Sequence, residues 1–435
     1  MLPNALASPS PNAPSRRAIA SWCLYDWANS AYNTIITTFV FAVYFARGVV
    51  GDPVEGTARW SAAMTVAGVA IALLSPVLGA IADRAGRRKP WMALFTLVTV
   101  LFTAALWWVR PDPADAAFAL ACVVVATVAF ELANVFYNAT LPGLVPERLF
   151  GRVSGWGWGI GYFGGLACLV LALVGFVKAP APLFGLFGME WADWGPQANV
   201  RATALLAAAW YGLFALPYFL WVPDEPSTGH GLIRAAREGV ATLVATLRQV
   251  RRYREVARFL VASAFYRDGI NTITMFGGIF AAGSFGMSFE EILVFAIALN
   301  VVAGAGAIGF AWMDDWLGAK PVILIALAGM GSCGLPLLLA TDRLWFWVFA
   351  LGLGLFFGPA QAAGRSMMAR LAPPGMSGEM FGLYGLTGRF VGFFGPLLFG
   401  LATQAFDSQR AGMATVLTFF VIGFGLMLAV REPVR

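Results

Sequence analysis

Charged and amide side chains recur inside the apolar stretches of this chain. Polar stripes along one face of a helix are formed by Asp26, Ser30, Asn33 and Thr37, and by Glu131, Asn134 and Asn138. Two further stretches carry Arg267, Asp268 and Asn271, and Gln361 and Arg365. A charge left unpaired in hydrocarbon is costly, so these groups must face water, a substrate or one another. Such a set can bind a polar solute or exchange a proton.

The stripes carry both signs of charge. The acids that can balance the arginines are Asp26, Glu131 and Asp268, and the arginines are Arg267, Arg365 and Arg389. A carboxylate in mid-membrane with neither water nor a cation beside it can take up and release a proton, and Asp26 and Glu131 are the candidates. Ion pairs between helices that never touch a substrate are the alternative for any single residue.

The elements that must hold these stripes are membrane-spanning helices. Of the 435 residues, 59% are hydrophobic and only 12% are charged, which is more apolar than a soluble domain requires. A helix of roughly 20 residues crosses the hydrocarbon core, and the chain holds about twelve stretches of that length. The expected fold class is an all-α membrane protein with about twelve transmembrane helices.

A charged hairpin with glycines occurs twice, at equivalent points of the chain. The first copy runs from Gly79 to Lys89, and a shorter copy runs from Asp315 to Lys320. A constant shift also superimposes Gly151 on Gly378 and several glycines beyond them. Duplicated halves predict two pseudo-symmetric six-helix bundles that rock around a site at their interface. The second copy has Ala311 in the place of a glycine and one residue fewer before its lysine, so an equal gate is not expected there.

The predicted organisation has an N-terminal tail at 1–18, bundles at 19–222 and 259–430, a linker at 223–258 and a C-terminal tail at 431–435. The linker is predicted to hold a basic amphipathic helix on the inner membrane surface, with Val240, Leu243, Leu247 and Val250 on one side. A solvated linker with no role in lipid binding is the alternative.

Lysine and arginine gather on the loops of one side, which the positive-inside rule assigns to the cytoplasm. Both termini are therefore expected in the cytoplasm, with the protein in an inner, plasma membrane of the bacterial type. The net charge of +6 then reflects membrane topology and predicts no binding to nucleic acid.

The sequence offers no set of residues for covalent or metal chemistry. The four cysteines lie in apolar stretches without metal-ligand spacing, and the single histidine, His230, has no histidine or cysteine near it. No Ser/His/Asp set and no nucleotide-binding loop can be assembled from the sequence. We therefore expect neither an enzyme, nor a metal site, nor a cofactor.

The hairpin Gly79-x-x-x-Asp83-Arg84-x-Gly86-Arg87-Arg88-Lys89 resembles the signature loop of the major facilitator superfamily, and Pro146-Glu-Arg148-x-x-Gly151-Arg152 resembles its usual companion. The stretches Trp22–Tyr32 and Ser154–Gly165 resemble the branch related to fungal autophagy-associated vacuolar amino-acid effluxers. The resemblance implies an alternating-access carrier whose first, fourth, seventh and tenth spans line a central cavity. It also implies a cytoplasmic gate built from Gly79, Asp83, Arg84, Gly86, Arg87 and Arg88.

We thus expect a secondary active transporter that moves a small polar solute, an amino acid or similar zwitterion, by alternating access with protons. The expected partners are the small-molecule substrate, membrane lipid and protons, and the protein is expected to be a monomer. One alternative is a proton-coupled exporter of amphipathic or drug-like compounds, favoured if Trp27, Tyr32 and Phe276 face the cavity. Another is a non-transporting membrane receptor on a carrier fold, which loss of the cavity charges would favour.

Overall fold

The structure, a computed structural model, describes residues 15–178, 191–226, 232–248, 252–392 and 394–432. The N-terminal half holds α1 (Arg16–Ala31), α2 (Phe41–Tyr44), α3 (Pro53–Ala85), α4 (Lys89–Ala105), α5 (Ala116–Ala139), α6 (Leu141–Leu144), α7 (Phe150–Ala172) and α8 (Ala198–Trp221). The C-terminal half holds α10 (Arg254–Phe285), α11 (Phe289–Leu317), α12 (Ala319–Leu339), α13 (Arg343–Leu355), α14 (Phe357–Leu371), α15 (Ser377–Val391), α16 (Phe394–Phe406) and α17 (Gln409–Leu428). Helix α9 (Leu232–Arg248) lies between the halves in the sequence.

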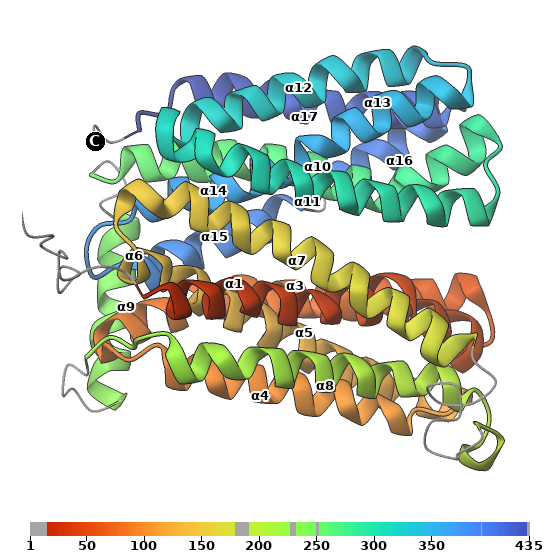
Figure 1. Cartoon of the computed structure of the whole chain (residues 1–435), viewed down its shortest axis with the longest axis horizontal. Helices are drawn as coiled ribbons and strands as arrows, with labels where there is room; N and C mark the ends of the chain where they lie inside the picture. Colours follow the sequence, from red (N-terminus) through yellow and green to blue (C-terminus); the bar gives the residue numbers. More distant parts are fainter. Residues whose placement is uncertain (1–14, 179–190, 227–231, 249–251, 393, 433–435) are drawn as a thin grey trace, which may run out of the picture.

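Shorter helical segments complete these elements. Two π-helical segments, Tyr32–Phe39 and Phe45–Val49, continue the first span beyond α1, and a third, Leu173–Val177, extends α7. The 3₁₀ turns are Leu106–Trp108, Pro113–Asp115, Glu147–Leu149 and Trp191–Trp194. The described ranges contain no β-strand, and Figure 1 shows the long helices side by side, those of each half grouped together. The predicted all-α membrane fold is confirmed.

Ten helical stretches of the described chain are long and apolar enough to cross a membrane. They match the predicted spans except for the first and the seventh. These two, the Arg16–Val49 stretch and α10, carry Asp26 and the Arg267–Asp268 pair in mid-helix, which lowers their hydropathy. Both run alongside the other long helices (Figure 1). Both spans that a purely apolar criterion misses carry predicted site residues.

Several helix ends follow from local sequence signals. Asp52 accepts hydrogen bonds from two backbone N–H groups in the first turn of α3, and Ser288 and Glu291 form a capping box at α11. Gly86 and Gly318 end α3 and α11 with φ angles of 82° and 106°, where residues with a side chain are strained. These two glycines allow the sharp turns that begin α4 and α12.

The two halves touch through a few helices rich in small residues. Helix α3 packs on α15, and α7 packs on both α11 and α14. At the α7–α11 contact, a Cβ added to Gly155 would lie 2.5 Å from that of Ala311, so the backbones approach closely. Large apolar side chains such as Leu73, Leu213 and Leu339 are exposed on the outside, as lipid-facing residues are.

Candidate functional site

An ion pair in mid-helix joins the two halves at α1 and α14. Nη1 of Arg365 lies 2.9 Å from Oδ2 of Asp26, and the side chains are 4% and 14% exposed, respectively. A buried ion pair is stable only when its remaining donors and acceptors also find partners. Asn29 supplies one such partner, because its side-chain amide donates a long hydrogen bond of 3.5 Å to Asp26.

The other donors of Arg365 are held by helices of the N-terminal half. Its Nε donates to Oγ of Ser154 at 2.9 Å, and its Nη2 donates to the Ser154 carbonyl at 2.7 Å. Nη1 also donates to Oδ1 of Asn138 at 3.3 Å. The rings of Trp22 and Tyr137 lie 4.7 and 5.5 Å from the guanidinium carbon, within reach of cation–π attraction. The guanidinium is therefore fixed by α1, α5 and α7 together.

The glycine series of α7 lets its backbone come this close. A Cβ at Gly157 would lie 2.5 Å from Oδ2 of Asp26 and 2.8 Å from Nη2 of Arg365, so a side chain would displace the pair. One turn further, a Cβ at Gly161 would lie 3.1 Å from Oγ of Ser30. The repeated glycines are thus needed to position the central ion pair.

A second ion pair between the halves joins Glu131 of α5 to Arg389 of α15. These side chains are 29% and 37% exposed, so a solute can reach them more easily than Asp26 and Arg365. Arg267 of α10 lies close by, donating to the Tyr384 carbonyl at 3.0 Å with its guanidinium carbon 4.1 Å from the Tyr384 ring. The structure therefore places both signs of charge on an accessible surface between the halves.

Asp268 is placed apart from these two pairs. Its Oδ2 accepts a hydrogen bond at 2.8 Å from the backbone N–H of Gly395 in the first turn of α16, and the residue is only 1% exposed. Within the described chain, its Oδ1 and the Thr272 hydroxyl beside it have no hydrogen-bond partner. The structure does not bring Asp268 together with the other predicted cavity residues.

The remaining predicted residues divide between contacts with the central pair and exposed positions. Ser30 donates to the Asp26 carbonyl at 2.7 Å, and Asn134 accepts from Asn29 at 3.1 Å. Thr37 donates to the carbonyl of Asn33, whose side chain is exposed, and Asn271 is also exposed. Gln361 is half-buried and hydrogen-bonds to Tyr162. Their roles toward a substrate stay predictions.

The predicted gate residues lie together at one end of the molecule, called here the gate end. Asp83 of α3 accepts hydrogen bonds from the backbone N–H groups of Gly378 at 2.9 Å and Glu379 at 2.8 Å, in the first turn of α15. A carboxylate is favourable at that position because the N-terminus of a helix carries partial positive charge. A Cβ at Gly79 would overlap the carbonyl oxygen of Gly378. Asp83 and Gly79 thus act together to bring α3 against α15.

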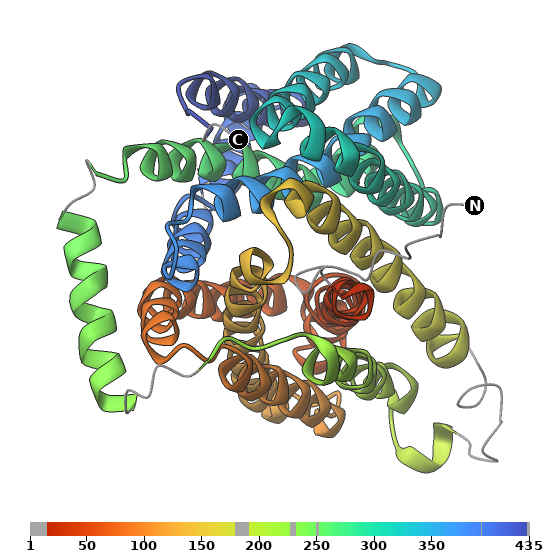
Figure 2. The same cartoon turned by 60° about the vertical axis from the view of Figure 1, so that its left-hand side comes forward.

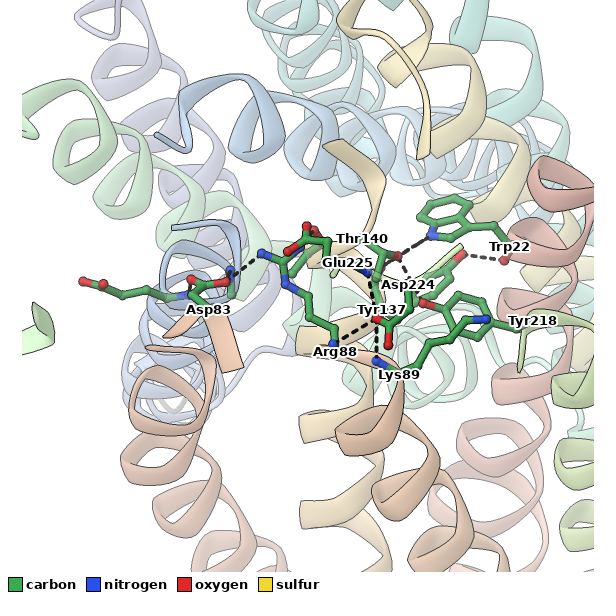
Figure 3. A network of polar contacts seen from close by, with 12 residues as sticks. Trp22, Asp83, Arg88, Lys89, Tyr137, Thr140, Tyr218, Asp224 and Glu225 are labelled. Carbon is green, nitrogen blue, oxygen red and sulfur yellow. Dashed lines mark hydrogen bonds and ion pairs between the residues drawn. The ribbon is translucent and has the colours of Figure 1, made fainter. Parts of the chain in front are cut away.

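Arg88 ties this contact to the end of α8, as Figure 3 shows. Its guanidinium donates to Asp83 at 2.7 Å, to Glu225 at 2.5 Å and to the Ala139 carbonyl at 3.0 Å. Asp224 accepts from the backbone N–H groups of Arg88 and Lys89 at 3.1 and 3.2 Å. Burial raises the pKa of Glu225 above its ordinary value, although the charge of Arg88 opposes this shift.

The other predicted gate residues lie around this cluster. Arg84 donates to the Thr242 hydroxyl of α9 at 2.7 Å, and Gly86 ends α3. Arg87 is exposed on the loop between α3 and α4. The contacts with Asp224 and Glu225 were not predicted from the sequence. The acidic run Pro223-Asp-Glu-Pro226, directly after a predicted span, could have indicated a partner for the basic hairpin.

The second copy of the hairpin holds α11 against α7 through contacts like those of the first copy, and the expectation of an unequal gate there stays a prediction. Asp315 accepts a hydrogen bond at 3.0 Å from the backbone N–H of Arg152, which lies in the first turn of α7. The carboxylate of Asp315 also forms an ion pair with Nε of Arg152 at 3.1 Å. Glu432 accepts from the backbone N–H groups of Ala319 and Lys320, as Asp224 does in the first copy. The shorter loop keeps the carboxylate at the helix end, which is what the contact requires.

Helix α9 crosses the gate end, transverse to the spans (Figure 1; Figure 2 shows it from another side). Its face with Ala235, Gly239 and Leu243 is buried, and a Cβ at Gly239 would lie 2.9 Å from backbone atoms of Ala80. Val240, predicted on the apolar side, is 42% exposed, whereas the side chains of Leu247 and Val250 lie outside the described set. One side of the helix packs on α3, and its position on the inner membrane surface stays a prediction.

Solved transporters of the major facilitator superfamily share this architecture. The proton:xylose symporter XylE bound to 6-bromo-6-deoxy-D-glucose matches with a TM-score of 0.74 at 13% identity, over 96% of each chain. The E. coli fucose:proton symporter FucP matches with a TM-score of 0.72 at 13% identity, over 96% of this chain and 98% of that one. These likenesses show that the chain has the major facilitator fold.

The family model described as "Vacuole effluxer Atg22 like" matches residues 58–433, and the chain belongs to this family. The MFS-type transporter YxiO of Bacillus subtilis (strain 168) is 29% identical over 422 residues, covering 95% of this chain and 94% of YxiO. Autophagy-related protein 22 of Cryptococcus neoformans is 26% identical over 293 residues, covering 62% of this chain but only 48% of the fungal protein. The family model and YxiO together define the class of this protein, which is a membrane transporter of the major facilitator type and not an enzyme.

Proposed function

We propose that this protein carries a small polar solute, an amino acid or similar zwitterion, across the membrane by alternating access. The observation that carries the proposal is that two of the ion pairs between the halves, Asp26–Arg365 and Glu131–Arg389, join residues of the predicted polar stripes to arginines of the other half. A rocking motion of the halves must break or exchange such pairs, and the charged ends of a zwitterion can replace the lost partners.

The solute is proposed to bind first at the more exposed pair. Glu131 can receive an ammonium group, and Arg389 with the nearby Arg267 can receive a carboxylate in the planar geometry that guanidinium favours. The buried pair, Asp26 and Arg365, would then break or exchange partners as the halves move. The tight contacts of α3 with α15 and of α7 with α11 are the proposed closed gate of this cycle.

The aromatic residues do not favour the alternative function, an exporter of amphipathic compounds. Trp27 stacks on Trp210 with ring centroids 5.6 Å apart, and Phe276 stacks on Phe399 at 4.1 Å. Tyr32 is buried and shares a hydrogen bond of 2.8 Å with Thr127. These rings pack into neighbouring helices, whereas an apolar substrate needs them in the cavity. The cavity charges, which a receptor could lose, are present.

Proton coupling is proposed to use Asp268 in place of Asp26 and Glu131. A coupling carboxylate is expected to have no cation beside it, but Asp26 and Glu131 each have an arginine partner. Among the described residues, Asp268 forms no ion pair and is buried with one free oxygen, so it can bind a proton without losing a cation. It faces Thr272 of its own helix and Gly395 of α16, and Arg267 beside it turns toward α15.

Replacing Asp268 with Asn should therefore uncouple uptake from the pH gradient. One coupled proton gives about tenfold accumulation per pH unit, so gradient-driven uptake into proteoliposomes should fall by about that factor. Exchange of solute without a gradient should persist. The matched control is Asp342→Asn, an exposed carboxylate in the same half, which should leave gradient-driven uptake unchanged. Unaltered gradient dependence in Asp268→Asn would exclude this residue as the coupling site.

We also propose in which membrane the protein lies, how it is oriented there and that it is a monomer. The bacterial relative YxiO supports a plasma-membrane protein, and the lysine and arginine on the gate-end loops support a cytoplasmic gate end with both termini in the cytoplasm. The bundles 19–222 and 259–430 are proposed as the two moving bodies of a monomer in contact with membrane lipid, and protons and a small polar solute are its other partners.

A thermal-shift screen of the purified protein against free amino acids tests the substrate class. A ligand at 100 times its Kd stabilises the folded state by about 2.7 kcal/mol, which raises the apparent Tm by several degrees in a chain of this size. We expect at least one amino acid to give such a shift in the wild type and none in an Asp26→Asn/Arg365→Gln variant. Shifts by amphipathic drug-like compounds alone would contradict the proposal.

A further inference from the structure

A groove of about 570 Å³ lies at the gate end, where the N-terminal segment of α7 meets the last turns of α11. Arg148 and Arg152 line it from the N-terminal half, and Trp312, Asp315 and Trp316 line it from the C-terminal half. Its walls therefore come from both moving bodies. The groove includes the Arg152–Asp315 ion pair, but it is not lined by the Asp26–Arg365 pair, the Glu131–Arg389 pair or Asp268.

The groove has an excess of positive charge. Arg152 is neutralised by Asp315, its Nε lying 3.1 Å from Oδ2, and the aspartate side chain is only 6% exposed. Arg148 is exposed, and within the described chain no ion pair includes it. With two arginines and one aspartate at the wall, one positive charge faces outward. This charge favours an anion.

The opposite wall of the groove is aromatic and exposed. Trp312 and Trp316 are 47% and 82% exposed, and Trp312 lies 6.0 Å from the guanidinium carbon of Arg152. Val301, about three turns before Trp312 on α11, is also exposed. Exposed tryptophans beside arginine are typical of the membrane interface, where headgroup and acyl chain meet.

We propose that this groove binds one anionic phospholipid of the phosphatidylglycerol type. Its phosphate would lie between Arg148 and Arg152, and its acyl chains would cover Trp312 and run along α11 toward Val301. A soluble phosphate ester satisfies the arginines but leaves the exposed tryptophans uncovered, so a lipid matches the groove better. Because the walls belong to different halves, the bound lipid holds α7 to α11 and stabilises the closed gate.

The test measures quenching of tryptophan fluorescence in vesicles that contain brominated phosphatidylglycerol or brominated phosphatidylcholine. We expect the wild type to prefer phosphatidylglycerol on the order of fivefold, from the attraction of one basic residue. Arg148→Gln should remove most of this preference. The matched control Arg237→Gln removes an exposed arginine from α9 and should keep it. A Trp312→Phe/Trp316→Phe variant should lose the excess quenching, which locates the signal.

Three results would overturn the assignment. The first is a preference for phosphatidylglycerol that Arg148→Gln retains in full, with Tm and emission maximum equal to those of the wild type. The second is equal quenching by the two lipids in the wild type. The third is loss of the preference when millimolar glycerol 3-phosphate is added, because the occupant would then be a soluble phosphate ester.

Discussion

Replacing Asp26 with Asn should abolish transport and also destabilise the fold. The substitution leaves Arg365 charged, 4% exposed and without its carboxylate. Breaking a buried pair in this way costs about 3–5 kcal/mol of folding free energy, which should lower the Tm. Uptake should fall to background, because the proposed transport cycle needs the carboxylate as the partner of Arg365. Uptake into proteoliposomes and the Tm of the purified variant measure the two effects.

The double variant Asp26→Asn/Arg365→Gln separates the effect on folding from the effect on transport. Removing both charges relieves the uncompensated guanidinium, so the Tm should return close to that of the wild type while uptake stays absent. Glu55→Gln is the control, because Glu55 pairs with Arg59 where both side chains are about half exposed. Such a pair contributes less than about 1 kcal/mol, and neither property should change. Recovery of uptake in the double variant would contradict a transport role for the pair.

Adding one methyl group at Gly79 should open the gate end. The Cβ would overlap the backbone of Gly378, and atoms of the backbone cannot move aside as a flexible side chain can. Overpacking typically costs about 1–3 kcal/mol, and this cost falls only on the closed arrangement, so the open population should rise about tenfold or more. Distances between spin labels at Arg87 and Pro374, both exposed at the gate end, report this change.

Gly68→Ala is the matched control for Gly79→Ala. Both glycines lie inside α3 and gain the same helix propensity, but a Cβ at Gly68 meets no heavy atom within 4 Å. The label distances should therefore match those of the wild type in the control and lengthen only in Gly79→Ala. Equal distances in the two variants would argue that the contact of α3 with α15 does not set the closed state.

The sequence predicted the helical fold and the signs of the buried charges, because a polar group in an apolar span is conspicuous. It could not assign partners across the halves. Arg365 and Asp26 are far apart in the chain, and their pairing depends on how α7 lies between them. Ser154, which takes two hydrogen bonds from Arg365, looked like part of a glycine-rich packing face. The repeated small residues were the available signal that another helix approaches there.

Neighbouring residues on a helix point in different directions, and this explains the placement of Arg267 and Asp268. Their side chains are separated by about 100° around α10, since a turn holds about 3.6 residues. Arg267 thus turns to α15, while Asp268 turns to α16. In α9 the sequence pattern emphasised large apolar residues, but the buried side is built on Ala235 and Gly239 because α3 approaches closely. Close approach between helices is a property of both partners and cannot be deduced from one.

Solute counterflow in proteoliposomes tests most directly whether a polar solute crosses between the halves at their ion pairs. Vesicles would be loaded with the amino acid that stabilises the purified protein, and entry of the labelled compound would be followed without a pH gradient. The wild type should show a transient overshoot of label, and the folded Asp26→Asn/Arg365→Gln variant should show none. An overshoot of equal size in that variant, or none in the wild type, would contradict the proposed transport mechanism.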